Sequence, residues 1–260
     1  MTSQELVDTA LTAARRAGKV VRGHYGHVKE INIKDRNWHE IVTDVDKESN
    51  EIIINTIKEK FPEHNIISEE SKQKKTNSDY TWYIDPLDGT TNFATQIPLF
   101  SVCVGLTLKN RIIMGVVYLP MEKEMFVAES DSGAALNGEK IKVSKNPDLK
   151  KTLVNFCHKS TMGSVKEIER IFSRFKLKAR AFRQVGSGGL DFAYVACGRN
   201  DVVLRPDIIP WDVIPGVILV REAGGKVTDW KGKEWNLDSP NLVATNGTKI
   251  HEEVLNLLKK

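Results

Sequence analysis

Two carboxylates that stand close together in the sequence are suited to holding a metal ion. Asp85 and Asp88 follow an apolar run and come directly before Gly89-Thr90-Thr91. Carboxylate oxygens at the end of a strand are good ligands for Mg²⁺. A glycine followed by hydroxyl residues offers backbone N–H groups and an O–H to a phosphate group. The segment therefore points to metal-assisted chemistry on a phosphate ester.

The residue between the two acids supports this interpretation. Pro86 fixes φ, so we expect it to force the chain out of a regular strand. A turn at this point would direct both carboxylates and the carbonyl oxygen of Leu87 toward one place. The alternative is a surface Asp-Pro turn followed by a helix N-cap. The Gly-Thr-Thr sequence that follows directly favours the metal site.

The segment from Asp85 to Asn92 resembles the signature motif of the inositol monophosphatase family of Mg²⁺-dependent phosphatases. Three further segments match motifs of that family, in the same order along the chain. They are Val42-Thr43-Asp44-Val45-Asp46, Glu69-Glu70-Ser71 and Trp211-Asp212-Val213-Ile214-Pro215-Gly216, the last followed by Glu222-Ala223-Gly224-Gly225. The matches cover nearly the whole chain. One such motif could arise by chance, but four in order are specific.

The resemblance implies a metal-binding role for each matching acid. Glu69, Asp85 and the main-chain oxygen of Leu87 would bind the first Mg²⁺. Asp85, Asp88 and Asp212 would bind the second, so that Asp85 bridges the two ions. Glu69 would also contact a third, weaker ion, which makes two or three Mg²⁺ per site. Four close carboxylates repel one another unless cations neutralise them.

The same resemblance implies which residues carry the reaction. The catalytic residues would be Asp46, Glu69 and Thr90, with Thr90 and Asp46 activating the attacking water. A hydroxyl alone is a poor base, but Thr90 paired with Asp46 can pass on a proton from that water. The phosphate would be bound by Asp88, Gly89 and Thr90, with the N–H groups of Gly89 and Thr90 at a helix N-terminus.

Two of these acids have alternative explanations. An aspartate at the start of a helix, such as Asp212, is often an N-cap or a first-turn acid that the helix dipole favours. Together with the other motifs, metal binding is the better interpretation. Glu69 and Glu70 are neighbours on what we expect to be an extended segment, where their side chains point to opposite sides. We therefore predict that Glu69 faces the metal ions and that Glu70 has a supporting role.

The substrate is less well defined than the reaction. Inositol monophosphatases commonly carry an acid several residues before the Trp-Asp motif, where it binds ring hydroxyls, and this chain has Arg205 there. Arginine binds phosphate or carboxylate and cannot accept a hydroxyl proton, which favours a substrate with a second anionic group. The alternative is a surface ion pair with Asp207. The substrate-binding candidates are Arg183, Gly186, Ser187, Arg205 and Asp212.

These observations predict a Mg²⁺-dependent phosphomonoesterase that acts on a small polyol or sugar phosphate. Inositol 1-phosphate is the first candidate, and a fructose-1,6-bisphosphatase or a dual-activity enzyme is the alternative. Histidinol phosphate and 3′-phosphoadenosine 5′-phosphate are further candidates, and a non-catalytic partner of RNA or a transcription complex is a different class of function. A haloacid-dehalogenase phosphatase is a rival class of enzyme, but it needs one residue between its two aspartates. Two residues separate Asp85 from Asp88, so the geometry of that class does not transfer to this chain.

Composition indicates which partners and which cellular compartment to expect. The net charge is +4, from 38 basic and 34 acidic residues that are interspersed, so nucleic-acid binding is not expected. The three cysteines form no close pair, which indicates a reducing compartment. No signal peptide is evident, and no apolar run approaches the ~20 residues that span a bilayer. We expect a cytoplasmic enzyme, and the resemblance implies a homodimer.

The first half of the chain is predicted to hold two helices followed by a largely antiparallel sheet. Apolar residues at helical spacing predict a helix over 4–24, and Thr43-Asp44 opens a second helix that stops before Pro62. Between them, 27–40 is predicted to be a loop or short hairpin. The predicted strands are 65–68, 82–85, 100–108, 111–119, 134–136 and 140–143. The basic segment 72–75 is predicted to be a solvated loop.

The second half alternates between strands and helices. The predicted strands are 153–156, 178–184, 201–204 and one starting at Val227, and the predicted helices are 165–174, 189–197 and 212–223. Such alternation indicates a layered α/β structure. By resemblance, the fold is an αβαβα sandwich of the inositol monophosphatase and fructose-1,6-bisphosphatase type. We place a boundary between 1–146, which carries the metal and phosphate motifs, and 147–260, which carries Asp212, within one compact unit.

Overall fold

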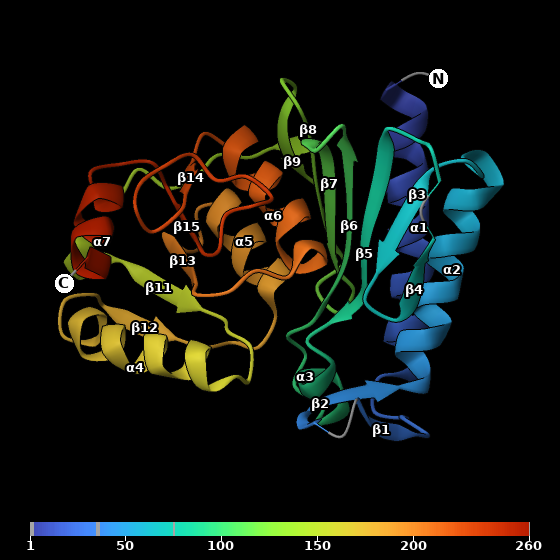
Figure 1. Ribbon diagram of the computed structural model, residues 1–260, viewed down its shortest axis with the longest axis horizontal. Coiled ribbons are helices and arrows are strands. Elements are labelled where there is room, and N and C mark those ends of the chain that lie inside the picture. The colour runs from blue at the N-terminus through green and yellow to red at the C-terminus, as the bar shows by residue number, and fades with distance from the viewer. Residues whose placement is uncertain (1–2, 35–36, 75, 260) are drawn as a thin grey trace.

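Five layers of helices and sheets alternate through the molecule. The computed structural model describes residues 3–34, 37–74 and 76–259, without the side chains of 72–74. One outer layer holds α1 (Ser3–His24) and α2 (Asp44–Lys60), the middle layer α5 (Gly188–Ala196) and α6 (Pro210–Glu222), and the other outer layer α4 (Met162–Lys176) and α7 (Ile250–Lys259). A sheet lies on each side of the middle layer (Figure 1). The predicted αβαβα sandwich is confirmed.

The first sheet is largely antiparallel, as predicted. Its order is β10-β9-β8-β7-β6-β5-β3-β4, and β3 runs parallel to β5. Its strands are β3 (Asn65–Ser68), β4 (Ser71–Lys74), β5 (Tyr80–Asp88), β6 (Ser101–Leu108), β7 (Arg111–Leu119), β8 (Glu124–Glu129), β9 (Gly133–Leu136) and β10 (Glu139–Lys140). The prediction of a loop at 72–75 is wrong where the structure describes it, because β4 is an edge strand that needs no apolar pattern. Lys75 lies outside the described residues.

The second sheet confirms the alternating pattern of the second half. Its order is β12-β11-β13-β15-β14, with β12, β11 and β13 parallel and β15 antiparallel to both neighbours. The strands are β11 (Leu153–Phe156), β12 (Ala181–Arg183), β13 (Val202–Arg205), β14 (Lys226–Thr228) and β15 (Leu242–Thr245). The sequence analysis missed β15 and α7. The boundary at residues 146 and 147 stays a prediction.

A short hairpin closes one end of the first half. Strands β1 (Ile31–Lys34) and β2 (Asn37–Thr43) pair in an antiparallel way, so the hairpin alternative for this region is correct. Thr43 then caps α2 and exchanges hydrogen bonds with Asp46 in a capping box. This cap has a functional consequence, because it holds the side chain of Asp46 at the end of the helix that faces the hairpin.

Glycines allow the middle helices to pack closely against the first sheet. A Cβ atom on Gly105 would lie 2.7 Å from the Ile214 side chain, and one on Gly115 would lie 2.5 Å from the carbonyl oxygen of Pro215. Helix α6 therefore lies nearly on the backbone of β6 and β7. This close approach matters for function because α6 carries Asp212 in its first turn.

None of the helices in the described part of the chain combines the length and apolar character that a membrane span requires.

We expect Gly115→Ala to destabilise the protein by about 1–3 kcal/mol, because the added methyl group must push α6 away from the sheet. Urea unfolding followed by circular dichroism measures this change. Gly163→Ala is the control, since a Cβ at Gly163, in α4, meets no atom within 4 Å. Equal stability of the two variants would contradict the close packing of α6.

Candidate active site and metal centre

A bulge in β5 brings the two motif aspartates to one side. Asp85 pairs with Cys103 of β6 and Asp88 with Ser101, so β5 has one more residue than its partner between these pairs. The prediction that the chain leaves regular strand geometry at Pro86 is therefore confirmed, but the expected turn is wrong, because β5 continues past Pro86 through the bulge. In a regular strand, side chains three residues apart lie on opposite faces, and the extra residue removes this alternation. Both carboxylates are buried.

Asp88 is held by the beginning of α5. Its Oδ1 accepts from the N–H of Gly188 at 2.9 Å, and its Oδ2 accepts from the N–H of Gly189 at 2.8 Å. The hydroxyls of Ser101 and Ser187 also donate to Oδ2, at 2.7 and 2.5 Å. Each carboxylate oxygen has about two acceptor sites. Oδ2 is therefore fully used, and Oδ1 is the oxygen that remains able to bind a metal ion.

Ser187 and Gly186 differ in how they contribute to the predicted substrate pocket. Ser187 is fully buried and caps α5, so it orients Asp88 instead of lining an open surface. Gly186 is exposed and has φ of +85°, a conformation that favours glycine.

Asn92 was not predicted to be a site residue, although it belongs to the signature motif. Its Nδ2 donates to the carbonyl oxygens of Val185 and Leu99 at 2.7 Å, which ties the motif to the segment before α5.

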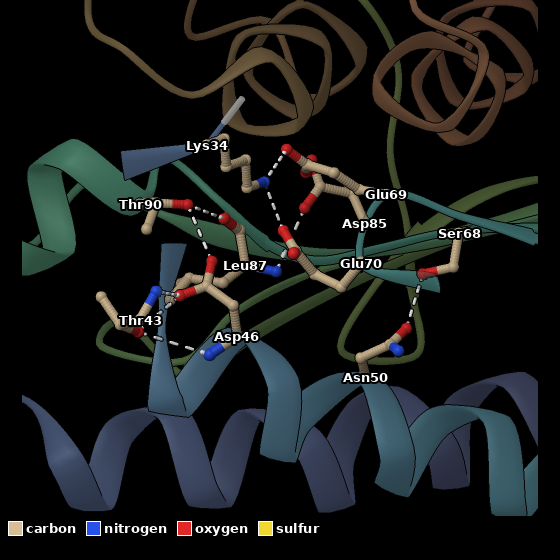
Figure 2. A network of polar contacts seen from close by, with 10 residues as sticks. All are labelled: Lys34, Thr43, Asp46, Asn50, Ser68, Glu69, Glu70, Asp85, Leu87 and Thr90. Atoms are coloured by element: carbon tan, nitrogen blue, oxygen red, sulfur yellow. Dashed lines mark hydrogen bonds and ion pairs between the residues drawn. The ribbon is translucent and has the colours of Figure 1, made fainter. Parts of the chain in front are cut away.

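Thr90 and Asp46 meet beside the carbonyl of Leu87, as their predicted role requires (Figure 2). The Oγ1 of Thr90 lies 2.9 Å from Oδ1 of Asp46 and 3.0 Å from the oxygen of Leu87. Thr90 opens the short helix α3 (Thr90–Ala94), and Gly89 precedes it with φ of +95°. Burial raises the pKa of Asp46 above its ordinary value, although hydrogen bonds from Thr43 and Thr90 partly offset this. A raised pKa makes Asp46 a better proton acceptor.

The predicted metal-binding acids affect one another electrostatically. Burial raises the pKa of Asp85 well above its ordinary value, and the charges of Glu69, Asp88 and Asp212 raise it further. Burial also raises the pKa of Asp212 to about 7, against the opposing effect of Arg205. Such mutual repulsion requires the carboxylates to be close together. The structure thus brings Glu69, Asp85, Asp88 and Asp212 into one region from strand β5, helix α6 and the turn after β3.

Glu69 and Glu70 are arranged differently from the prediction. They form the turn between β3 and β4 instead of an extended segment, so their side chains do not point to opposite sides. Both accept a hydrogen bond from Nζ of Lys34, at 2.6 Å for Oε1 of Glu69 (Figure 2). The sequence analysis missed Lys34, which lies in the region predicted as a loop or hairpin and carries no motif.

Arg205 pairs with a predicted metal ligand. It is 1% exposed, and its Nη2 lies 2.9 Å from Oδ2 of Asp212 and 3.9 Å from Oδ1 of Asp207. The ion pair with Asp207 is therefore present, but the expectation that it lies at the surface is wrong, because Arg205 is buried and pairs more closely with Asp212. Within the described structure, Nε and Nη1 of Arg205 have no hydrogen-bond partner. Arg183 is exposed on the edge strand β12, and none of the described hydrogen bonds or ion pairs joins it to these residues.

The donor atoms suit a hard cation. As placed, no three His, Cys, Asp or Glu side chains of the described residues are grouped closely enough to hold a metal ion together. The candidate donors are nevertheless all oxygens, four carboxylates and the carbonyl of Leu87, which suit Mg²⁺ better than zinc. The charges of Glu69, Asp88 and Asp212 raise the pKa of Asp85. A divalent cation would relieve this repulsion, so the residues fit Mg²⁺ by their chemistry.

Comparison with known proteins identifies the family. A model of the inositol monophosphatase family matches residues 2–260. The chain belongs to this family. Its members are in general Mg²⁺-dependent phosphatases. The resemblance to this family that the sequence indicated is therefore confirmed.

Individual relatives carry more than one name. A Thermotoga maritima protein named fructose-1,6-bisphosphatase/inositol-1-monophosphatase is 37% identical over 254 residues, covering 98% of this chain and 96% of the relative. The Escherichia coli protein named Nus factor SuhB is 37% identical over 255 residues, covering 97% and 95%. Among solved structures, SuhB from Bartonella henselae matches with a TM-score of 0.93 at 30% identity, covering 98% of this chain and 99% of that one.

We expect Asp85→Asn to stabilise the chelator-treated protein at about pH 8, raising Tm by a few degrees. The raised pKa of Asp85 means that the folded protein loses stability as pH rises through that pKa, whereas asparagine does not titrate. The difference should shrink as the pH falls toward about 5. Thermal unfolding across this range tests it, with Asp238→Asn, at an exposed acid, as the control. A constant difference at every pH would contradict the electrostatic explanation.

Proposed function

We propose that this protein is a Mg²⁺-dependent phosphomonoesterase that hydrolyses a small polyol or sugar phosphate. The observation that carries the proposal is the Thr90–Asp46 pair, which lies beside the Leu87 carbonyl. This pair supplies a route for a proton, and the neighbouring acids supply oxygen ligands. Family membership supports the same reaction class.

Five groups of this chain would hold the metal ions. Glu69, Asp85 and the Leu87 carbonyl would bind one ion, and Asp85, Asp88 through Oδ1, and Asp212 would bind another. Mg²⁺, when bound, acts as a Lewis acid and lowers the pKa of water. The bulge in β5 and the clamp at the start of α5 orient the ligands that come from the signature motif.

The Thr90–Asp46 pair can activate the attacking water. Thr90 donates its hydroxyl proton to Asp46, which leaves lone pairs on Oγ1 to accept a proton from water. As the water loses its proton to Thr90, the threonine passes its own proton to Asp46. Asp46 is suited to receive it because burial raises its pKa. The N–H groups of Gly89 and Thr90, at the start of α3, would bind phosphate oxygens.

Asp207 offers a way to recognise a polyol despite the arginine at the position of the family acid. Arg205 is committed to Asp212 and is almost fully buried, so it is poorly placed to receive a second anionic group without moving. Beside it, Oδ1 of Asp207 is buried 3.9 Å from Nη2 of Arg205 and has no hydrogen-bond partner within the described structure, so a substrate hydroxyl would reach it after a local side-chain movement. A carboxylate oxygen of this kind can accept a substrate hydroxyl. We therefore place inositol 1-phosphate first and fructose 1,6-bisphosphate second.

We expect Thr90→Ala to lower kcat by about a hundredfold or more, because the proton route to Asp46 is lost. Thr90→Ser, which keeps the hydroxyl, should retain most of the activity. Phosphate release at saturating Mg²⁺ gives kcat, and calorimetric titration shows whether Mg²⁺ binding is intact. Near-normal turnover of Thr90→Ala with intact metal binding would exclude this route.

A substrate panel should separate the candidate functions. With Mg²⁺, kcat/KM is measured for inositol 1-phosphate, fructose 1,6-bisphosphate, histidinol phosphate, 3′-phosphoadenosine 5′-phosphate and the simple ester p-nitrophenyl phosphate. We expect Asp207→Asn to lower kcat/KM for inositol 1-phosphate by about two- to tenfold, the value of one hydrogen bond, and to affect p-nitrophenyl phosphate less.

Equal losses on both substrates would exclude recognition of a hydroxyl by Asp207. If the wild-type protein hydrolyses none of these esters, the non-catalytic alternative gains support, since some relatives are named Nus factor. The homodimer and the cytoplasmic location stay predictions.

A further inference from the structure

Helix α2 presents polar side chains to the segments that carry the predicted metal ligands. Asp46, Ser49 and Asn50 are buried, and the last two follow Asp46 by three and four positions, so they share one side of the helix. Further along the same side, Ile53 and Ile57 are fully buried in a hydrophobic core that includes residues of β5. Apolar packing therefore fixes the middle of the helix, and its first turns contact the site through polar groups.

Ser49 binds the backbone inside the bulge of β5. Its side chain is fully buried, and Oγ donates to the carbonyl oxygen of Pro86 at 2.7 Å. Neither Pro86 nor Leu87 has a paired residue in β6, and a buried carbonyl needs a hydrogen-bond partner. Pro86 lies between Asp85 and Leu87, whose carboxylate and carbonyl oxygens are proposed to bind the same ion. Ser49 therefore fixes the backbone that joins two ligands of one metal ion.

Asn50 makes a corresponding contact with the other ligand segment. Its Oδ1 accepts from the hydroxyl of Ser68 at 2.5 Å, and both residues are buried (Figure 2). Ser68 ends β3 and directly precedes Glu69. Two consecutive residues of α2 thus hold the two segments that supply Glu69, Asp85 and the carbonyl of Leu87.

We propose that Ser49 and Asn50 are positioning residues that give this metal site a preference for Mg²⁺ over Ca²⁺. The inference rests on the proposed function in one respect, namely that Glu69, Asp85 and the carbonyl of Leu87 bind one ion. It adds two residues that none of the four motifs contains. It also assigns α2 a role beyond that of Asp46, since the same helix sets the spacing between the two ligand segments.

The preference follows from the rigidity of the arrangement. Mg²⁺ requires near-ideal octahedral geometry, whereas the larger Ca²⁺ accepts more ligands in a flexible geometry. Buried hydrogen bonds from one well-packed helix keep the ligand segments at a fixed spacing, which suits Mg²⁺. Without the hydroxyl of Ser49, the bulge is free to adjust. This loss should therefore weaken Mg²⁺ binding more than Ca²⁺ binding.

The test measures Mg²⁺ and Ca²⁺ binding to the chelator-treated full-length protein by isothermal titration calorimetry. We expect Ser49→Ala to weaken Mg²⁺ binding about tenfold or more, as is typical when the partner of a metal ligand is removed. Ca²⁺ binding should weaken about threefold or less, so that the ratio of the two affinities falls. Asn50→Ala, which frees the segment before Glu69, is the second variant and should shift this ratio in the same direction.

Thr56→Ala is the matched control. Thr56 is a buried hydroxyl residue about two turns further along α2, and it accepts from Arg16 instead of contacting the site. Circular dichroism shows whether each variant is folded, and the control should leave both affinities unchanged. An unchanged affinity ratio in the folded Ser49 and Asn50 variants would overturn this inference alone. Failure of the wild type to bind Mg²⁺ would overturn both this inference and the proposed metal site.

Discussion

Repulsion among buried carboxylates is the constraint on which the rest of this site depends. Glu69, Asp88 and Asp212 all act to raise the pKa of Asp85, in addition to the effect of its burial. Such a cluster is stable only where positive charge or N–H groups balance it. The chain provides a partner for each of the other three acids. Lys34 pairs with Glu69, the start of α5 holds Asp88, and Arg205 pairs with Asp212.

The layered fold is what makes these partners available. The bulged end of β5 supplies two of the acids, and the middle helices lie against the same sheet. Helix α5 begins at Gly188, beside Asp88, so its unpaired N–H groups face a carboxylate that the helix dipole also favours. Helix α6 reaches the site because glycines in β6 and β7 leave room for it. The close packing of the middle helices on the first sheet therefore also brings together the acids and the groups that balance their charge.

Prediction from the sequence succeeded where the signal lay in neighbouring residues and failed where the structure depends on pairing with other strands. The helix starting at Thr43-Asp44 was found through its cap, and β6 and β7 were found as apolar runs. The edge strand β4 was missed because polar residues can form an edge strand without an apolar pattern. The departure from a regular strand at Pro86 was predicted correctly, but a bulge takes the place of the expected turn, and a bulge depends on the register with β6.

The sequence by itself determined the family and its phosphatase class, because side-chain chemistry and motif order are properties of the chain alone. The motifs alone identified the candidate catalytic and metal-binding residues Asp46, Glu69, Asp85, Thr90 and Asp212. Only the tertiary structure decided which groups balance their charges. Lys34 and Arg205 meet Glu69 and Asp212 through elements joined by the folded arrangement, and no pattern in the sequence encodes such contacts. The physical reason is that electrostatic partners are selected by distance in space.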